Sequence, residues 1–146
     1  MKLNPQHAPL NILLADDDID DRSFFEKALH EIHVATKLIT VNNGDELMEY
    51  LSGHPADLPD IIFLDLSMPR KTGFECLAEI KENEKLKDIY VVMFTTSFTR
   101  SIDFEQKLMD TLSGMGAQDY IRKPGGFKEL KQVIGKVLAD VTEKRR

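Results

Sequence analysis

Acidic side chains are concentrated in one short stretch near the start of the chain. Five carboxylates fall within the six residues Asp16-Asp17-Asp18-Ile19-Asp20-Asp21, directly after the apolar run 12–15. One or two of them would be enough to cap a helix, because a carboxylate accepts the free N–H groups of a helix N-terminus and opposes its dipole. So many carboxylates repel one another, which favours a bound cation. The stretch alone leaves helix capping and metal binding open.

Three further residues that could do chemistry each follow an apolar run. Asp65 closes the run 61–64, Thr95 follows the run 90–94, and Lys123 stands between the run 120–121 and Pro124. Each also has an ordinary interpretation. Asp65 and the hydroxyls of Thr95-Thr96-Ser97 could cap helices, and a lysine before proline is usually an extended, solvated loop residue. Taken singly, none of these residues assigns a function.

The pattern of apolar runs predicts how these residues are positioned. Most runs are continuous rather than alternating, which is typical of parallel strands buried on both faces. Helical spacing of apolar residues predicts the segments between them to be helices. The expected strands are residues 12–15, 37–41, 61–64, 90–94 and 120–121, and the expected helices lie within residues 25–32, 45–51, 73–83, 101–115 and 130–141. The sequence therefore predicts an α/β fold, an open doubly wound five-stranded parallel sheet with five helices.

In such a sheet, ligands bind outside the carboxyl ends of the strands. This placement brings together the carboxylates of Asp16, Asp17 and Asp65, the hydroxyl of Thr95 and the ammonium of Lys123. Mg²⁺ prefers a few carboxylates together with water and phosphate oxygens. Lysine and a hydroxyl suit the remaining oxygens of a phosphoryl group. The predicted chemistry is phosphoryl transfer with an aspartate as the nucleophile.

At this point the sequence resembles a known family, the receiver domains of two-component response regulators, which have a flavodoxin-like fold. The resemblance spans about residues 11–141 and rests on ordered motifs: Ile-Leu-Leu-Ala-Asp16-Asp17, Asp65-Leu-Ser-Met-Pro69 followed by Thr72-Gly73, Thr95, and Tyr120-Ile-Arg-Lys123-Pro124. The opening Asp-Asp-Asp-Ile-Asp-Asp-Arg and the Thr-Thr-Ser stretch look most like stand-alone receivers that pair with bacterial phytochrome-type kinases. The resemblance implies a sensor histidine kinase as partner and Mg²⁺ as cofactor.

The resemblance also implies a role for each matching residue. Asp65 would be the phosphoacceptor, Asp17 a direct Mg²⁺ ligand, and Asp16 a ligand mainly through water. Ser67 would contribute its backbone carbonyl to the metal. A serine here and another at position 97 occupy family positions that tune hydrolysis of the phosphoaspartate.

The remaining implied roles concern the bound phosphoryl group and its readout. Thr95 would bond the phosphoryl group, Lys123 would pair with it, and Tyr120 would be the aromatic switch that turns from exposed to buried. The sequence departs from the family in two places. The segment 95–116 is several residues longer than is usual in the family, and Gly125-Gly126 loosens the loop after Lys123.

Composition limits the organisation of the chain and its partners. Its 146 residues suit one domain, so we expect a single receiver domain over 1–146 without an output domain. The absence of a long apolar run excludes a membrane span, and the polar, proline-broken start predicts no leader and hence a cytoplasmic protein. A formal net charge of -6 argues against nucleic-acid binding. Output is expected through a downstream protein partner or a homodimer.

Three alternatives compete with this interpretation. Asp16-x-Asp18 after an apolar strand mimics a haloacid-dehalogenase-like phosphatase, but no later acidic metal motif follows the lysine. Asp16, Asp18 and Asp20 could begin an EF-hand loop, but its sixth and twelfth positions are Asp21 and Lys27 instead of Gly and Glu. The third alternative is a receiver-like module that binds partners without being phosphorylated.

Overall fold

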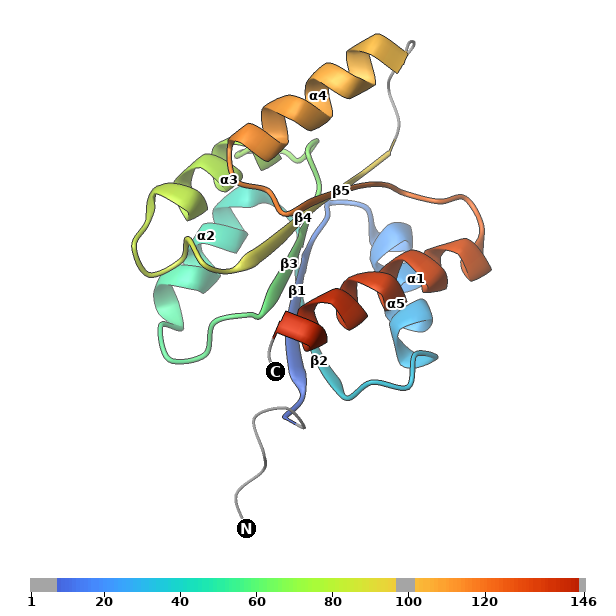
Figure 1. Ribbon diagram of the computed structural model, residues 1–146. Helices are drawn as coiled ribbons and strands as arrows, with labels where there is room; N and C mark the ends of the chain where they lie inside the picture. Colours follow the sequence, from blue (N-terminus) through green and yellow to red (C-terminus); the bar gives the residue numbers. More distant parts are fainter. Residues whose placement is uncertain (1–7, 97–101, 145–146) are drawn as a thin grey trace.

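The chain folds around one parallel sheet, as Figure 1 shows. The computed structural model describes residues 8–96 and 102–144. Within these residues, five parallel strands are arranged in the order β2-β1-β3-β4-β5. The strands are β1 Leu10–Ala15, β2 Thr36–Val41, β3 Ile61–Leu64, β4 Tyr90–Thr95 and β5 Asp119–Arg122. The predicted fold class is therefore confirmed.

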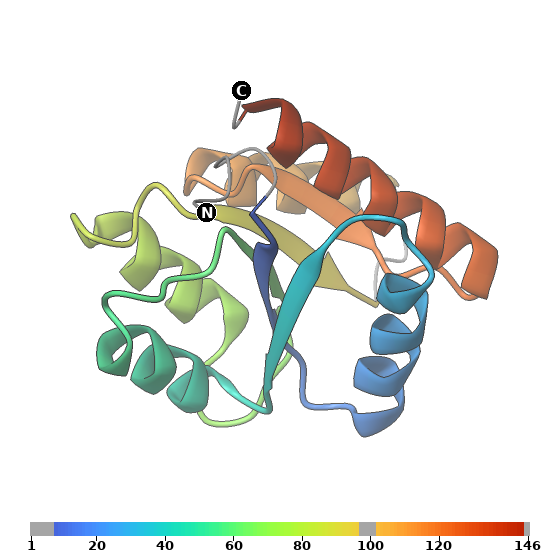
Figure 2. The same cartoon turned by 90° about the horizontal axis from the view of Figure 1, so that it is seen from below.

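Helices cover both faces of the sheet. They are α1 Ile19–His30, α2 Gly44–Gly53, α3 Gly73–Glu82, α4 Ile102–Gly114 and α5 Phe127–Lys144. One core layer lies under α1 and α5, and the other lies under α2, α3 and α4 (Figure 2). The predicted helix within residues 101–115 begins at Ile102 in the structure, and residue 101 is outside the described part of the chain.

Local signals in the sequence explain where several helices begin and which face they bury. Asp18 caps α1, Asn43 caps α2, and Thr72 forms a capping box with Glu75 at the start of α3. In α5 the buried side chains recur at intervals of three and four residues: Leu130, Ile134, Val137, Leu138 and Val141. This spacing places one apolar stripe against the sheet.

Burial of the strands follows their position in the sheet, and this corrects one expectation. The central strands β1, β3 and β4 are buried almost throughout. The prediction of burial on both faces is wrong for β2, where only Val41 is buried and Ile39 is 42% exposed. β2 is an edge strand, so it has a neighbour on one side only and less helix cover. The other edge strand, β5, is also only partly buried.

The register of the sheet determines which residues meet at its carboxyl edge. Ala15 pairs with Leu64, so the residues that follow them, Asp16 and Asp65, leave the sheet side by side. On the next strands Thr95 pairs with Arg122, directly before Lys123. No helix in the described parts of the chain is long and apolar enough to cross a membrane.

Candidate functional site

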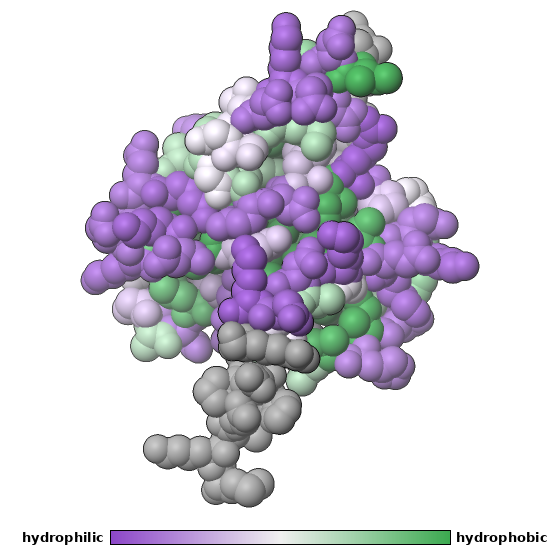
Figure 3. All heavy atoms as spheres, in the orientation of Figure 1, coloured by the Kyte–Doolittle hydropathy of each residue, from purple (hydrophilic) through white to green (hydrophobic). Residues whose placement is uncertain are grey.

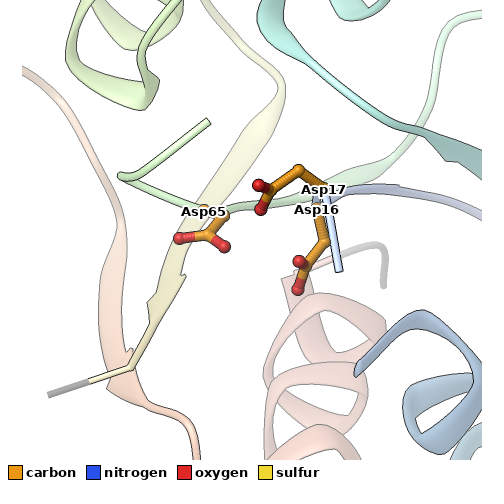
Figure 4. A group of neighbouring side chains, drawn as sticks. All are labelled: Asp16, Asp17 and Asp65. Carbon is orange, nitrogen blue, oxygen red and sulfur yellow. The ribbon is translucent and has the colours of Figure 1, made fainter. Parts of the chain in front are cut away.

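Three aspartates meet at the carboxyl ends of β1 and β3. Asp16, Asp17 and Asp65 each offer a carboxylate oxygen, and these atoms all lie within 4.8 Å of one another. Asp16 and Asp65 are 1% and 6% exposed, whereas Asp17 is exposed and its side chain points toward Asp65 (Figure 4). The group comprises hard oxygen donors open to solvent on one side. This donor set fits a divalent cation such as Mg²⁺, which keeps several water ligands.

A lysine ammonium lies among these carboxylates. The Lys123 Nζ is 2.6 Å from Asp16 Oδ2, 3.0 Å from Asp21 Oδ2 and 3.2 Å from Asp65 Oδ2. Only 9% of its side chain is exposed, so its contacts with the buried Asp16 and Asp65 are shielded from water, whereas its contact with the 39% exposed Asp21 is partly open. The interpretation of Lys123 as a solvated loop residue is therefore wrong. Its backbone N–H donates to the carbonyl of Thr95 at 2.8 Å, which extends the pairing of β5 with β4 beyond Arg122.

Both oxygens of the Asp65 carboxylate accept hydrogen bonds. Its Oδ1 accepts from the Thr95 hydroxyl at 3.0 Å and from the Ser67 backbone N–H at 3.1 Å, and its Oδ2 accepts from Lys123. Thr95 is 1% exposed and its hydroxyl donates to Asp65, so it caps no helix within residues 8–96 and 102–144. Thr96 is exposed, and Ser97 lies outside the described residues.

Burial and the lysine act in opposite directions on Asp16. Burial raises the pKa of the Asp16 carboxyl above its usual 3.8, and the hydrogen bond from Lys123 offsets only part of this rise. Burial would lower the pKa of Lys123. The hydrogen bond to Asp16 and the charge of Asp65 outweigh burial, so the pKa of Lys123 lies above its usual 10.5. Lys123 is therefore a cation at neutral pH, and ionised Asp16 depends on that cation.

The acidic stretch that follows β1 has two roles in the structure, because one aspartate caps α1 and two others join the carboxylate group. Asp18 caps α1, since its Oδ1 accepts from the backbone N–H groups of Asp20 and Asp21 at 2.8 and 3.0 Å. Asp16 and Asp17 join the group with Asp65. This division contradicts the EF-hand alternative, which needs Asp16, Asp18 and Asp20 around one ion.

Three residues contribute to the site in ways that the sequence interpretation missed. Asp21 binds Lys123, and the Arg22 Nη1 donates to the Asp16 carbonyl at 2.8 Å. A Cβ on Gly73 would lie 2.3 Å from the Asp65 carbonyl oxygen, so only glycine permits this approach of α3 to the loop after β3. Helical spacing could have indicated Asp21, which lies four residues before the buried Phe25.

Tyr120 lies on β5, apart from the carboxylates. It pairs with Met93 in the sheet, is half-buried, and packs against the core layer under α4. With Met109 and Leu112 it lines a pocket of about 190 Å³. Burial raises the pKa of its phenol above the usual 10. The structure therefore places Tyr120 beside α4, between exposed and fully buried.

Comparisons with known proteins agree with this geometry. The family model described as "Response regulator receiver domain" matches residues 12–135 of this chain. Response regulator Rcp1 of Synechocystis sp. is 38% identical over 93 residues, which span 61% of this chain and 63% of Rcp1. The two-component response regulator ARR17 of Arabidopsis thaliana is 30% identical over 140 residues, which span 90% of this chain and 86% of ARR17.

Solved structures give the same result. The phosphorylated cyanobacterial phytochrome response regulator RcpA has a TM-score of 0.77 at 33% identity, covering 89% of this chain and 91% of that one. The Mn²⁺-bound form of Rcp1 has a TM-score of 0.76 at 29% identity, covering 90% and 93%. These matches set aside the haloacid dehalogenase alternative. Because the receiver match covers most of the chain, this protein belongs to the response regulator receiver domain family of two-component systems.

Proposed function

We propose that this chain accepts a phosphoryl group from the phosphohistidine of a sensor histidine kinase onto Asp65. One observation carries the proposal. The Thr95 hydroxyl and the Lys123 ammonium both bind the Asp65 carboxylate, next to Asp16 and Asp17. A hydroxyl and a cation on the acceptor itself are suited to receive the oxygens of an incoming phosphoryl group.

In the proposed reaction, an oxygen of Asp65 attacks the phosphorus in line with the phosphohistidine nitrogen. The new P–O bond forms as the P–N bond breaks, and the imidazole nitrogen keeps the electron pair and takes up a proton. Lys123 then pairs with the negative charge of the phosphoryl oxygens, and Thr95 donates its hydroxyl to one of them. The contribution of the protein is mainly positioning and neutralisation of charge.

The residues that would hold a cation follow from the same arrangement. Asp17 is proposed as a direct ligand of Mg²⁺, Asp16 as a ligand mainly through water, and Ser67 as the donor of a backbone carbonyl; Asp65 completes the set. When bound, Mg²⁺ would neutralise the charge that gathers on the transferring group. The name of the Mn²⁺-bound form of Rcp1 supports a divalent cation in a related protein.

The partner of this reaction is proposed from the relatives. RcpA is described as a phytochrome response regulator and its structure as phosphorylated. We therefore favour a phytochrome-type kinase as phosphodonor, in the cytoplasm. The net charge of -6 supports output to a protein partner or a homodimer rather than to nucleic acid. We also propose that residues 1–146 form a single receiver domain, with its core at about 11–141.

The readout is proposed to pass through Thr95 and Tyr120. A phosphoryl group on Asp65 offers strong acceptor oxygens that would draw the Thr95 hydroxyl away from its present position. Space beside Thr95 would then let Tyr120 turn inward from its half-buried position. The phosphate would bias a two-state surface of α4, β5 and α5.

The central test uses the intact protein, Mg²⁺ and a small-molecule phosphodonor. Intact mass spectrometry should detect one added phosphoryl group on the parent and none on Asp65→Asn. A parent that takes up no phosphate would instead favour the receiver-like binding module. Phosphate that persists on Asp65→Asn would assign the acceptor to another residue.

A further inference from the structure

Lys123 has one carboxylate partner that lies outside the proposed metal group. Among the residues that the structure describes, its partners are Asp16, Asp21 and Asp65. Two of them, Asp16 and Asp65, belong with Asp17 to the group that could hold a cation. Asp21 does not. It lies in the first turn of α1, and 39% of its side chain is exposed.

A divalent cation would compete with Lys123 for the same carboxylates. The shortest contact of Lys123, 2.6 Å, is to Asp16, and its contact with Asp65 is 3.2 Å. Two cations that share these oxygens repel each other, and burial of the site weakens screening by water. Without a further anion, the ammonium would either hinder the entry of the cation or be displaced from the site. Asp21 supplies a carboxylate to Lys123 from outside the group that would hold the divalent cation.

The turn between β1 and α1 holds Asp21 in this position. Its backbone N–H donates to the Asp18 carboxylate at 3.0 Å, which fixes the first turn of the helix. The neighbouring Arg22 donates to the Asp16 carbonyl at 2.8 Å, which ties the same turn to the end of β1. Because these contacts anchor the turn that carries Asp21, we expect its carboxylate to stay beside Lys123 when another cation binds Asp16.

We propose that Asp21 is a positioning residue that retains the Lys123 ammonium in the site when a divalent cation binds Asp16 and Asp65. The inference rests on the function proposed above and extends it to the coexistence of two cations in one site. Asp21 would thereby keep Lys123 available for the phosphoryl group. Its removal should weaken cation binding, because Lys123 would then depend on Asp16 and Asp65 alone.

The first test compares Asp21→Asn with Asp20→Asn by calorimetric titration with Mg²⁺. Asp20 is the matched control: it is exposed, stands in the same turn, carries the same charge and is not among the carboxylates that Lys123 binds. Asp21→Asn should raise the Mg²⁺ dissociation constant about three- to tenfold, the range of one partly exposed charge-assisted hydrogen bond. Asp20→Asn should change it less than about twofold. Equal effects of the two substitutions would overturn the proposal.

The second test repeats the comparison in a Lys123→Met background. If Asp21 acts through Lys123, Asp21→Asn should then affect the dissociation constant no more than Asp20→Asn does. A full effect of Asp21→Asn in the absence of Lys123 would show that Asp21 acts on the cation by its own charge, and would refute the positioning role. This double-mutant cycle measures the coupling of the two residues directly.

The third measurement follows the lysine itself. NMR of the ¹⁵N-labelled lysine ammonium in the Mg²⁺-loaded protein should detect Lys123 as protected from exchange in the parent and in Asp20→Asn, but not in Asp21→Asn. Protection that survives in Asp21→Asn would contradict the proposal. None of these measurements needs phosphate on Asp65. A parent that binds Mg²⁺ with the predicted pattern but accepts no phosphate would refute the proposed function and leave this inference intact.

Discussion

Lys123→Met removes the only cation that contacts the buried carboxylates of Asp16 and Asp65 within the described residues. Lys123 is 9% exposed and lies within 3.2 Å of both carboxylates. Methionine keeps most of the aliphatic stem, so packing near the Phe94 ring, which lies 5.8 Å from Nζ, should be largely preserved. The substitution therefore tests charge compensation more than packing.

The expected cost follows from burial. Removing one partner of a buried ion pair typically costs about 3 to 5 kcal/mol, because the other charge is left uncompensated. The site is open to water on the side of Asp17 and Asp21, so water can partly solvate the carboxylates that lose Lys123. We therefore expect a loss of unfolding free energy at the low end of this range, about 3 kcal/mol, in metal-free solution at about pH 8. For a chain of this size that corresponds to a melting temperature lower by about 10 °C.

The loss of unfolding free energy in Lys123→Met, called the deficit below, should become smaller as the pH falls. The folded-state pKa of Asp16 is raised by burial, so the folded state binds more protons than the unfolded state between the two pKa values. Acidification through that window therefore favours folding. Loss of Lys123 removes a hydrogen bond that lowers this pKa, so the window of the variant should begin at higher pH. Lys123 itself, with its pKa raised above 10.5, stays charged throughout the neutral range and does not oppose this trend.

Mg²⁺ should make the stability difference between Lys123→Met and the parent smaller. The variant lacks the ammonium that competes for Asp16, so Mg²⁺ should stabilise it more than it stabilises the parent. Urea unfolding followed by far-ultraviolet circular dichroism suits a chain without tryptophan. The reasoning is wrong if the variant is as stable as the parent at about pH 8 without metal, or if its deficit is unchanged at about pH 5.

Three other substitutions test separate parts of the site. Asp17→Ala should abolish Mg²⁺ binding in a titration without destabilising the metal-free protein, because adjacent carboxylates repel each other; Mg²⁺ binding as tight as in the parent would contradict this role. Thr95→Ala should still take up phosphate on Asp65 in the mass assay, but the NMR shifts around Tyr120 on phosphorylation should be smaller; equal shifts would disprove the coupling. Gly73→Ala should lower the free energy of unfolding by about 2 to 3 kcal/mol and slow phosphate uptake, since its Cβ would meet backbone 2.3 Å away.

The elements that the sequence predicted best are those whose local signals and tertiary surroundings agree. β1, β3 and β4 are continuous apolar runs, and each is buried between two layers of helices. β2 is more mixed, because it contains Thr36, Lys37 and Thr40, and its apolar residue Ile39 remains exposed at the edge of the sheet. The exposure of Ile39 follows from the position of β2 at the edge of the strand order. Strand order depends on contacts between distant segments, which hydrophobic periodicity does not encode.

The positions of the proposed catalytic residues were predictable for a similar reason. Parallel strands carry the residues that follow them to the same edge, so Asp16, Asp65, Thr95 and Lys123 converge in any parallel arrangement that makes their strands neighbours. Their orientation was less predictable. The pairing of Thr95 with Asp65 Oδ1, and not with a helix N-terminus, depends on packing at that edge.

The acidic stretch shows most clearly how far local rules extend. Successive residues of a helix differ by about 100° in direction, so Asp20 and Asp21 face different ways. Asp21 lies four and seven residues before the buried Phe25 and Ala28, which places it on the face of α1 that packs inward. That much follows from the spacing alone. What this carboxylate meets there does not, because Lys123 lies 102 residues away in the chain. A charged residue on an inward-facing helical position near a strand end therefore predicts a counter-charge, and the fold determines which one.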